Sequence, residues 1–235
     1  MKLKVIGCSN SWTPRFSSCY LVNDNILMDC GADAYKGYIQ TGKDFQDIKL
    51  FLITHFHADH IYGLNVFLTA LHRRPYLFNF KPTFVGPKGV KEACHRVFST
   101  SNLFDVDFSK LANFIEVEDG DSFDFEDIKI TGIKLDHGDV EDFGFLLTQN
   151  GKTLGYSGDS TLCNNLVPFI EASDVCILHP SRMKSNEKHL GADDFERFVN
   201  QYPNKTLLAG HCDEDVYNRP LIKANRVEEG MEIEI

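Results

Sequence analysis

The stretch that decides the fold spans residues 49 to 60 and consists of Lys49-Leu50-Phe51-Leu52-Ile53-Thr54-His55-Phe56-His57-Ala58-Asp59-His60. Its first half is a short apolar run, which predicts a buried strand. Its second half holds three imidazoles and a carboxylate, a cluster that no hydrophobic core requires. Histidine and aspartate are common ligands of transition metals. The stretch therefore predicts a metal site directly after a buried strand.

The residues after this cluster predict a helix. Between positions 61 and 71 the apolar side chains stand at Leu64, Phe67, Leu68 and Leu71, which is the spacing of one helix face. The cluster thus lies where a strand ends and a helix begins. In α/β proteins this junction is a usual place for a functional site.

The spacing of the ligands divides them into two pairs. Alternate residues of an extended segment face the same side, so His55 and His57 can hold one ion together. Asp59 and His60 follow where the chain turns into the helix. These two residues can therefore reach a second ion.

Three further ligand-type residues follow apolar strands in the same way. They are His137, Asp159 and His211, and glycines beside the last two allow a close approach of the backbone to an ion. Each residue alone is unremarkable at a strand end. With the first cluster the count reaches seven, which suits two metal ions that share a carboxylate.

The rest of the chain alternates between strand-like and helix-like runs. Many of the strands are hairpin-like, so the sequence predicts a mixed α/β fold with two sheets covered by helices rather than a doubly wound parallel sheet. We expect strands at Leu3–Cys8, Ser18–Asn23, Ile26–Cys30, Ile48–Thr54, Thr83–Pro87, Phe114–Val117, Ser122–Phe125, Ile128–Leu135, Gly144–Gln149, Thr153–Ser157, Val175–Leu178, Thr206–Ala209 and Met231–Ile235, and helices at Gly31–Ile39, Val90–Phe98, Asn165–Ala172 and Asp193–Gln201.

Length and composition favour a single domain over residues 1–235 in a reducing compartment. The 235 residues are 43% hydrophobic, and no linker or repeat divides them. The N-terminal apolar run is too short for a signal peptide, and no run approaches the ~20 residues of a membrane span, so no membrane partner is expected. Seven cysteines without a CxxC pair favour reduced thiols and a cytoplasmic location.

The net charge of −10 argues against a large polyanionic substrate.

The ordered ligand motifs carry a family resemblance. The set His55-x-His57-x-Asp59-His60, His137, Gly158-Asp159-Ser160 and Gly210-His211 resembles the metallo-β-lactamase-fold hydrolases. The segments Gly7-Cys8-Ser9, Arg15-Phe16-Ser17-Ser18-Cys19, Leu27-Met28-Asp29-Cys30-Gly31-Ala32, Phe143-Gly144-Phe145 and Tyr156-Ser157-Gly158 are similar to the ribonuclease Z-like phosphodiesterase branch. The resemblance implies a four-layered αββα sandwich, and a homodimer is a common arrangement in the family.

The resemblance also implies how the ligands are shared. His55, His57 and His137 would bind one divalent ion, Asp59, His60 and His211 would bind the other, and Asp159 would bridge them. The family's metal is usually zinc, with manganese or iron as alternatives.

A catalytic helper is implied at His189, which stands just before a predicted helix. Its role would be to stabilise the transition state or to protonate the leaving group. The chain departs from the branch after the strand at Val175–Leu178, where a glutamate that orients the helper is common and this chain has His179-Pro180.

This chemistry favours a phosphodiesterase. Two ions lower the pKa of a shared water, which serves as the nucleophile, and Asp59 can hold its proton. We expect a small phosphodiester or nucleotide as the substrate.

A tRNA 3′-end endonuclease is the alternative, disfavoured by the acidic charge and the lack of an evident tRNA-binding arm. A lactone or carboxylic ester hydrolase could use the same ligands. A di-iron redox protein is disfavoured by His57, and a metal-binding module without activity by the complete ligand set.

Overall fold

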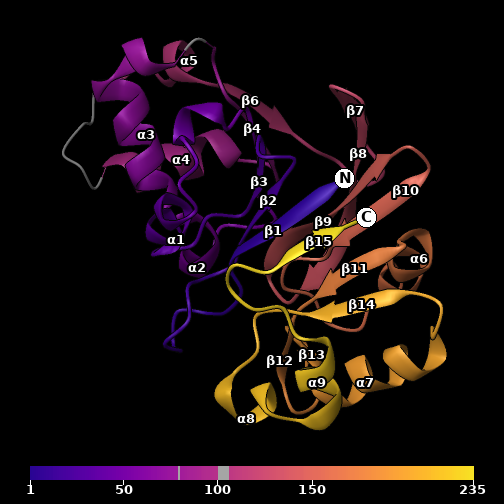
Figure 1. Ribbon diagram of the computed structural model, residues 1–235. Coiled ribbons are helices and arrows are strands. Elements are labelled where there is room, and N and C mark those ends of the chain that lie inside the picture. Colours follow the sequence, from indigo (N-terminus) through magenta and orange to yellow (C-terminus); the bar gives the residue numbers. More distant parts are fainter. Residues whose placement is uncertain (79, 100–105) are drawn as a thin grey trace. The chain divides into compact units, whose positions relative to one another are not determined.

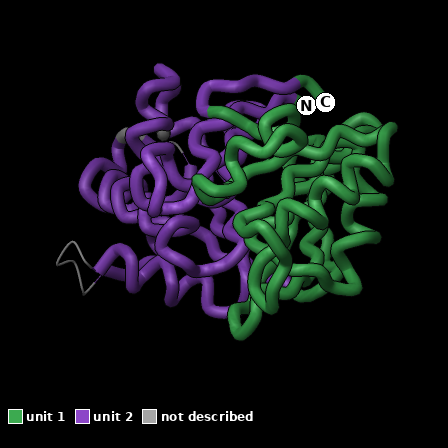
Figure 2. The backbone as a smooth tube through the Cα atoms, turned by 90° about the horizontal axis from the view of Figure 1, so that it is seen from below, with its two compact units in different colours: residues 1, 118–228, 234–235 green, residues 2–117, 229–233 purple. Residues whose placement is uncertain are grey.

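The computed structural model describes residues 1–78, 80–99 and 106–235. Within it the chain forms two compact units, which Figure 2 distinguishes by colour. The N-terminal unit consists of residues 2–117 and 229–233, and the C-terminal unit consists of residues 1, 118–228 and 234–235. That residues 1–235 act as one domain stays a prediction.

The N-terminal unit is built on a seven-stranded sheet with the strand order β15-β1-β2-β3-β4-β5-β6. β1, β2 and β3 are antiparallel, whereas β3 to β6 run parallel. The strands are β1 (Lys2–Gly7), β2 (Cys19–Val22), β3 (Ile26–Met28), β4 (Leu50–Leu52), β5 (Thr83–Gly86), β6 (Asn113–Glu116) and β15 (Glu232–Glu234). Because β3 and β4 are parallel neighbours, the residues that follow them, Asp29 and Thr54, reach the same edge of the sheet.

Helices cover this sheet on one side, as Figure 1 shows for α1, α3 and α4. Their apolar faces and the strands enclose a core that includes Phe51, Phe67 and Phe84, all buried. The helices are α1 (Ala34–Gln40), α2 (Ala58–Ile61), α3 (Leu64–Arg73), α4 (Val90–Ser99) and α5 (Phe108–Leu111), with two short 3₁₀ turns, η1 (Phe45–Asp47) and η2 (Pro75–Leu77).

The C-terminal unit contains a six-stranded sheet with the order β14-β11-β10-β9-β8-β7. β7 to β10 are antiparallel, and β10, β11 and β14 are parallel. The strands are β7 (Ser122–Phe125), β8 (Ile128–His137), β9 (Val140–Gln149), β10 (Lys152–Tyr156), β11 (Val175–Leu178) and β14 (Thr206–Ala209). β8 runs in the same direction as β10, because both are antiparallel to β9. Four strands therefore end at one edge of this sheet.

A second core lies between this sheet and its helices, with Phe169, Phe195 and Leu207 among its buried residues. Figure 1 shows α6 and α7 beside β11 and β14. The helices are α6 (Leu166–Ala172), α7 (Ala192–Gln201), α8 (Glu214–Tyr217) and α9 (Pro220–Asn225), and a small ribbon pairs β12 (Pro180–Arg182) with β13 (Leu190–Gly191).

The predicted mixture of two sheets and covering helices is confirmed, with local differences. The helix expected after the histidine cluster is divided into α2 and α3 at Gly63. A Cβ atom at Gly63 would lie 2.2 Å from the carbonyl oxygen of Gly31, so the backbones meet too closely for any other residue. The helix expected from Gly31 begins at Ala34, and the β12–β13 ribbon, α5, α8 and α9 were not predicted.

Two expectations concern what the chain lacks. Among the described residues, no helix is long and apolar enough to cross a lipid bilayer. The segment between Pro87 and His137, where the sequence shows no basic insertion for tRNA, contains α4, α5 and β6 to β8, and residues 100–105 lie outside the described part.

Candidate metal centre

The N-terminal unit presents its ligand-type residues on the loop after β4 and on α2. The N–H of Ile53 donates to the carbonyl of Val85 at 2.8 Å, which keeps the chain extended beyond the strand. His55 follows this extended segment and is fully buried. Asp59 and His60 lie within α2, and their ligand atoms are within 4.8 Å of each other.

A buried carboxylate, Asp29, orients this loop. Its Oδ1 accepts the backbone N–H of Thr54 at 2.9 Å, and its Oδ2 accepts the Thr54 hydroxyl at 2.9 Å. The same Oδ2 lies 2.7 Å from Nδ1 of His60. A carboxylate only accepts hydrogen bonds, so Nδ1 of His60 carries the proton and Nε2 is the nitrogen available to a metal.

His55 is oriented by the hydroxyl of Thr54, which is itself bonded to Asp29. Its Nδ1 is 3.0 Å from the Thr54 hydroxyl oxygen. That hydroxyl has one proton, which it donates to Asp29, so it accepts a hydrogen bond from His55. His55 therefore also keeps Nε2 for a metal, in the same sense as His60.

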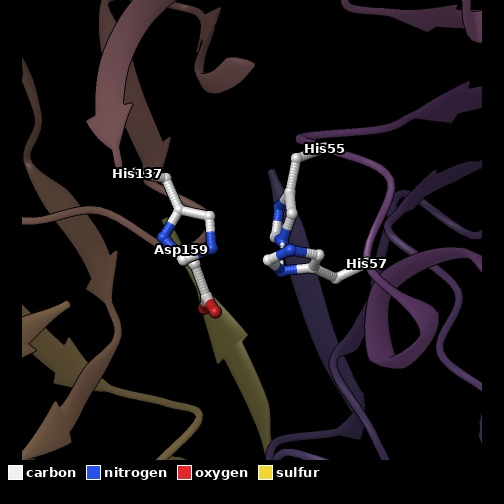
Figure 3. Close-up of side chains that lie close together, drawn as sticks. All are labelled: His55, His57, His137 and Asp159. Carbon is white, nitrogen blue, oxygen red and sulfur yellow. Dashed lines mark hydrogen bonds between the residues drawn. The ribbon is translucent and has the colours of Figure 1, made fainter. Parts of the chain in front are cut away.

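The rings of His55 and His57 meet edge to face, with centroids 4.6 Å apart, as Figure 3 shows. Nε2 of His55 is 3.0 Å from Nδ1 of His57. Two nitrogens that bind one tetrahedral zinc at ~2.0–2.1 Å are roughly 3.3 Å apart. The two rings thus have the separation that a shared ion requires.

The C-terminal unit carries its ligand-type residues at the ends of its parallel strands. His137 is the last residue of β8, Asp159 follows β10, and His211 follows β14. All three are buried. His211 has a positive φ of 54°, and Gly158 before Asp159 has a φ of 62°. The backbone therefore adopts the left-handed conformation at or just before both ligand-type residues.

The tautomer of His137 follows from its partner. Its Nδ1 lies 2.7 Å from the carbonyl oxygen of Lys188, which can only accept, so Nε2 again remains for a metal. The ligand atoms of His137 and Asp159 are within 4.8 Å of each other, and Figure 3 draws both side chains. Nδ1 of His211 is 3.0 Å from the hydroxyl oxygen of Ser181.

Asp159 is the central acceptor of this unit. Its Oδ1 lies 2.8 Å from Nδ1 of His179 and 3.6 Å from Nδ1 of His211. Its Oδ2 lies 3.7 Å from Nδ1 of His189. The carboxylate is 2% exposed, so its surroundings are these imidazoles rather than water.

His189, the predicted helper, therefore does come to the side of Asp159. It lies in the loop before β13, where the side-chain oxygen of Asn186 accepts its backbone N–H at 2.8 Å. Its ring meets that of His137 edge to face at 4.9 Å. Burial lowers the pKa of His189, and the negative charge of Asp159 opposes this shift.

Two residues that contact candidate ligands, Asp29 and His179, were missed by the sequence argument. His179 was noted only as a departure from the resembling branch, yet it is buried against Asp159. Both residues directly follow strands, β3 and β11. That position was the available signal, because His137, Asp159 and His211 share it.

The predicted metal ligands are thus divided between the units. The described residues place His55, His57, Asp59 and His60 together in one unit, and His137, Asp159 and His211 at one sheet edge of the other. Imidazole and carboxylate donors suit zinc and other first-row divalent ions. The oriented nitrogens fit such a cofactor.

Comparison with known proteins identifies the family of the chain and its relatives. The family model described as anti-Pycsar protein Apyc1 matches residues 1–226. Ribonuclease Z of Picrophilus torridus is 24% identical over 231 residues, which cover 78% of this chain and 70% of that protein. Three other curated ribonucleases Z are matched over 42% to 48% of their length, so the chain spans about half of those relatives.

Solved structures share the fold. The metallo-β-lactamase fold protein YhfI of Bacillus subtilis has a TM-score of 0.78 at 18% identity, covering 99% of this chain and 98% of that one. The short form of human tRNase Z has a TM-score of 0.76 at 19% identity, covering 100% and 99%. The expected metallo-β-lactamase fold is thereby confirmed. The chain belongs to the family of the anti-Pycsar protein Apyc1, has the metallo-β-lactamase fold and is similar in sequence to ribonucleases Z.

Proposed function

We propose that this protein is a dinuclear metal-dependent phosphodiesterase whose substrates are small phosphodiesters, such as cyclic or short nucleotide diesters. His55, His57 and His137 would hold one ion. Asp59, His60 and His211 would hold the second ion. Asp159 would be the shared ligand, and zinc is the metal that we expect.

The observation that carries this proposal is the common orientation of the imidazoles. In both units the outer nitrogen, Nδ1, of a proposed ligand meets a polar partner: Thr54 for His55, Asp29 for His60, Lys188 for His137 and Ser181 for His211. Outer partners of this kind are typical of metal-binding histidines, because they set the tautomer and the ring direction. Four of the five proposed histidine ligands thus keep Nε2 for an ion, whereas the fifth, His57, has its Nδ1 3.0 Å from Nε2 of His55. Histidines of an ordinary core have no reason to share such an arrangement.

When bound, two divalent ions lower the pKa of a water molecule and offset the negative charge that develops on a phosphodiester during hydrolysis. Asp59 is half-buried beside His60, and we assign it the proton of the attacking water. His189 is 19% exposed and lies beside Asp159, so we assign it the stabilisation or protonation of the leaving oxygen. Because the histidines and carboxylates of the proposed site are assigned to ions, to their ligands or to proton transfer, no covalent intermediate is proposed.

The choice of a small substrate rests on charge. The net charge of −10 repels a long polyanion, whereas a single phosphodiester group carries only one negative charge. The second candidate is tRNA 3′-end cleavage, which is favoured by the curated relatives named ribonuclease Z.

A cytoplasmic location is also proposed: in the described part of the chain, which contains all seven cysteines, there is no disulfide.

The test is a comparison of substrates on protein reconstituted with zinc or manganese. We expect hydrolysis of cyclic nucleotides and of an aryl phosphodiester, and at most weak cleavage of a precursor tRNA. Elemental analysis should find about two ions per chain, and Asp159→Ala should abolish turnover. Efficient tRNA cleavage would favour the second candidate, whereas one ion or none after reconstitution would contradict the dinuclear centre.

A further inference from the structure

His179 lies between two proposed metal ligands at the edge of the C-terminal sheet. It directly follows β11, which is flanked in the sheet by β10 and β14. Because these three strands are parallel, Asp159, His179 and His211 all emerge at the same edge. The position of His179 thus follows from the strand order rather than from its distance along the chain.

The contacts of His179 involve both neighbours. It is 1% exposed, and its Nδ1 is 2.8 Å from Oδ1 of Asp159. The carboxylate can only accept, so Nδ1–H of His179 donates this hydrogen bond. The ring of His179 stacks on that of His211 with centroids 4.9 Å apart and an interplanar angle of 18°.

A second aromatic ring, that of Tyr156, also contacts the imidazole of His179. Tyr156, the last residue of β10, meets the His179 ring edge to face at 5.4 Å and 72°. Since Tyr156 is fully buried, the imidazole cannot swing aside without disturbing the core. His179 is therefore held rigidly while it holds Asp159.

We propose that His179 is a positioning residue for the metal centre. Its Nδ1–H holds one oxygen of Asp159, and its ring face sets the plane of His211, so that both ligands are oriented before an ion binds. This inference rests on the proposed function, in which Asp159 bridges the ions and His211 binds the second one. Holding one lone pair of Oδ1 leaves Oδ2 and the other lone pairs for the metals.

A purely structural role would make different demands. A side chain that only fills space should be replaceable by any residue of similar size, whichever atom donates. A positioning role requires a donor at the place of Nδ1. Asparagine puts its amide nitrogen near that place, whereas glutamine puts its amide near Nε2, and alanine has neither.

The experiment therefore compares His179→Asn, His179→Gln and His179→Ala. Zinc affinity is measured by competition with a chromophoric chelator, together with the ion content after dialysis and the thermal midpoint. We expect the alanine and glutamine variants to bind the second ion about 10- to 100-fold more weakly, as for lost outer partners of metal ligands. The asparagine variant should remain within a few-fold of the wild type. His95→Asn, on α4 of the N-terminal unit, is the matched control and should keep its ion content.

The outcomes separate this inference from the proposed function. A wild-type protein that binds fewer than two ions contradicts the dinuclear centre itself. A wild type with two ions and three variants of unchanged affinity overturns the positioning role. An asparagine variant as weak as the glutamine variant overturns it as well, since the donor at Nδ1 would then be irrelevant. If the alanine variant fails to fold, the asparagine–glutamine comparison still decides.

Discussion

Oδ2 of Asp29 lies 2.7 Å from Nδ1 of His60, and both side chains are fully buried. The carboxylate also holds Thr54, so one residue after β3 orients both the strand end and the helix of the histidine loop. Asp29 does this from a backbone φ of 53°, which is uncommon outside glycine, asparagine and aspartate. Asp29 is thus as much a part of the proposed site as the ligands it orients.

Asp29→Asn should weaken metal binding without unfolding the protein. Asparagine tolerates the positive φ, but its amide group would face the donors of Thr54 and His60 with a donor of its own. We expect about a 10- to 100-fold loss of zinc affinity, measured by chelator competition. The thermal midpoint serves as the check on folding. An Asp29→Asn protein with wild-type affinity would show that the loop orients itself without this carboxylate.

His189→Ala should lower turnover while the ion content stays at the wild-type value. Nδ1 of His189 is 3.7 Å from Asp159, beyond hydrogen-bonding distance, so His189 does not orient this ligand by a hydrogen bond. We expect kcat to fall about 100-fold or more, as when a general acid is removed. The measurements are steady-state kinetics on an aryl phosphodiester and elemental analysis.

Lys188→Ala is the companion control for His189. It removes the neighbouring side chain but keeps the backbone carbonyl that orients His137. This variant should retain its metal. Loss of metal from His189→Ala alone would instead make His189 a ligand or a support of the site.

In the native protein, Cys163 should be the thiol that reacts. It is half-buried, whereas the other six cysteines are buried. Burial raises the pKa of both Cys94 and Cys176 to about 12, so roughly 1 in 10⁴ of these thiols is ionised near pH 8. Iodoacetamide labelling followed by mass spectrometry should find one modified residue in native protein and seven in urea. Rapid labelling of a buried cysteine, or of native Cys163→Ser, would contradict this burial pattern.

Asp174 should make the stability of the C-terminal unit pH-dependent. Its Oδ2 accepts the backbone N–H of Thr153 at 2.8 Å, and this bond, with the nearby Lys152, lowers the pKa of Asp174. A pKa lowered by folding adds stability above the unfolded value of about 3.9, and this contribution is lost as the pH falls through the folded value. The exposed Lys152 adds little, because water screens it.

Asp174→Ala is therefore expected to lower the free energy of unfolding by about 1 kcal/mol at pH 7. Urea denaturation at pH 7 and pH 3 measures the difference, which should shrink at the lower pH. Asp174→Asn keeps an acceptor for Thr153 but cannot titrate, so it separates the hydrogen bond from the charge. A difference that stays constant between the two pH values would refute the linkage.

Several elements of the fold were predictable because their cause is local. The apolar run at residues 50–53 became β4, and the spacing of Leu64, Phe67 and Leu68 became the buried face of α3. The close approach of Gly63, between α2 and α3, to the carbonyl of Gly31 was not predictable, since it is a contact between distant parts of the chain. Likewise, no periodic pattern in the sequence predicts that β12 and β13 pair with each other.

By itself, the sequence determined which residues are candidate metal ligands and where along the chain they stand. An apolar strand followed by a histidine or aspartate is a local pattern, and parallel strands bring such residues to one edge. The tertiary structure decided which atom of each candidate ligand is left available to a metal ion. That choice depends on partners far away in the chain, Asp29 for His60, Lys188 for His137 and His179 for Asp159. Hydrogen bonds select tautomers through distance and direction, and only the folded backbone sets these.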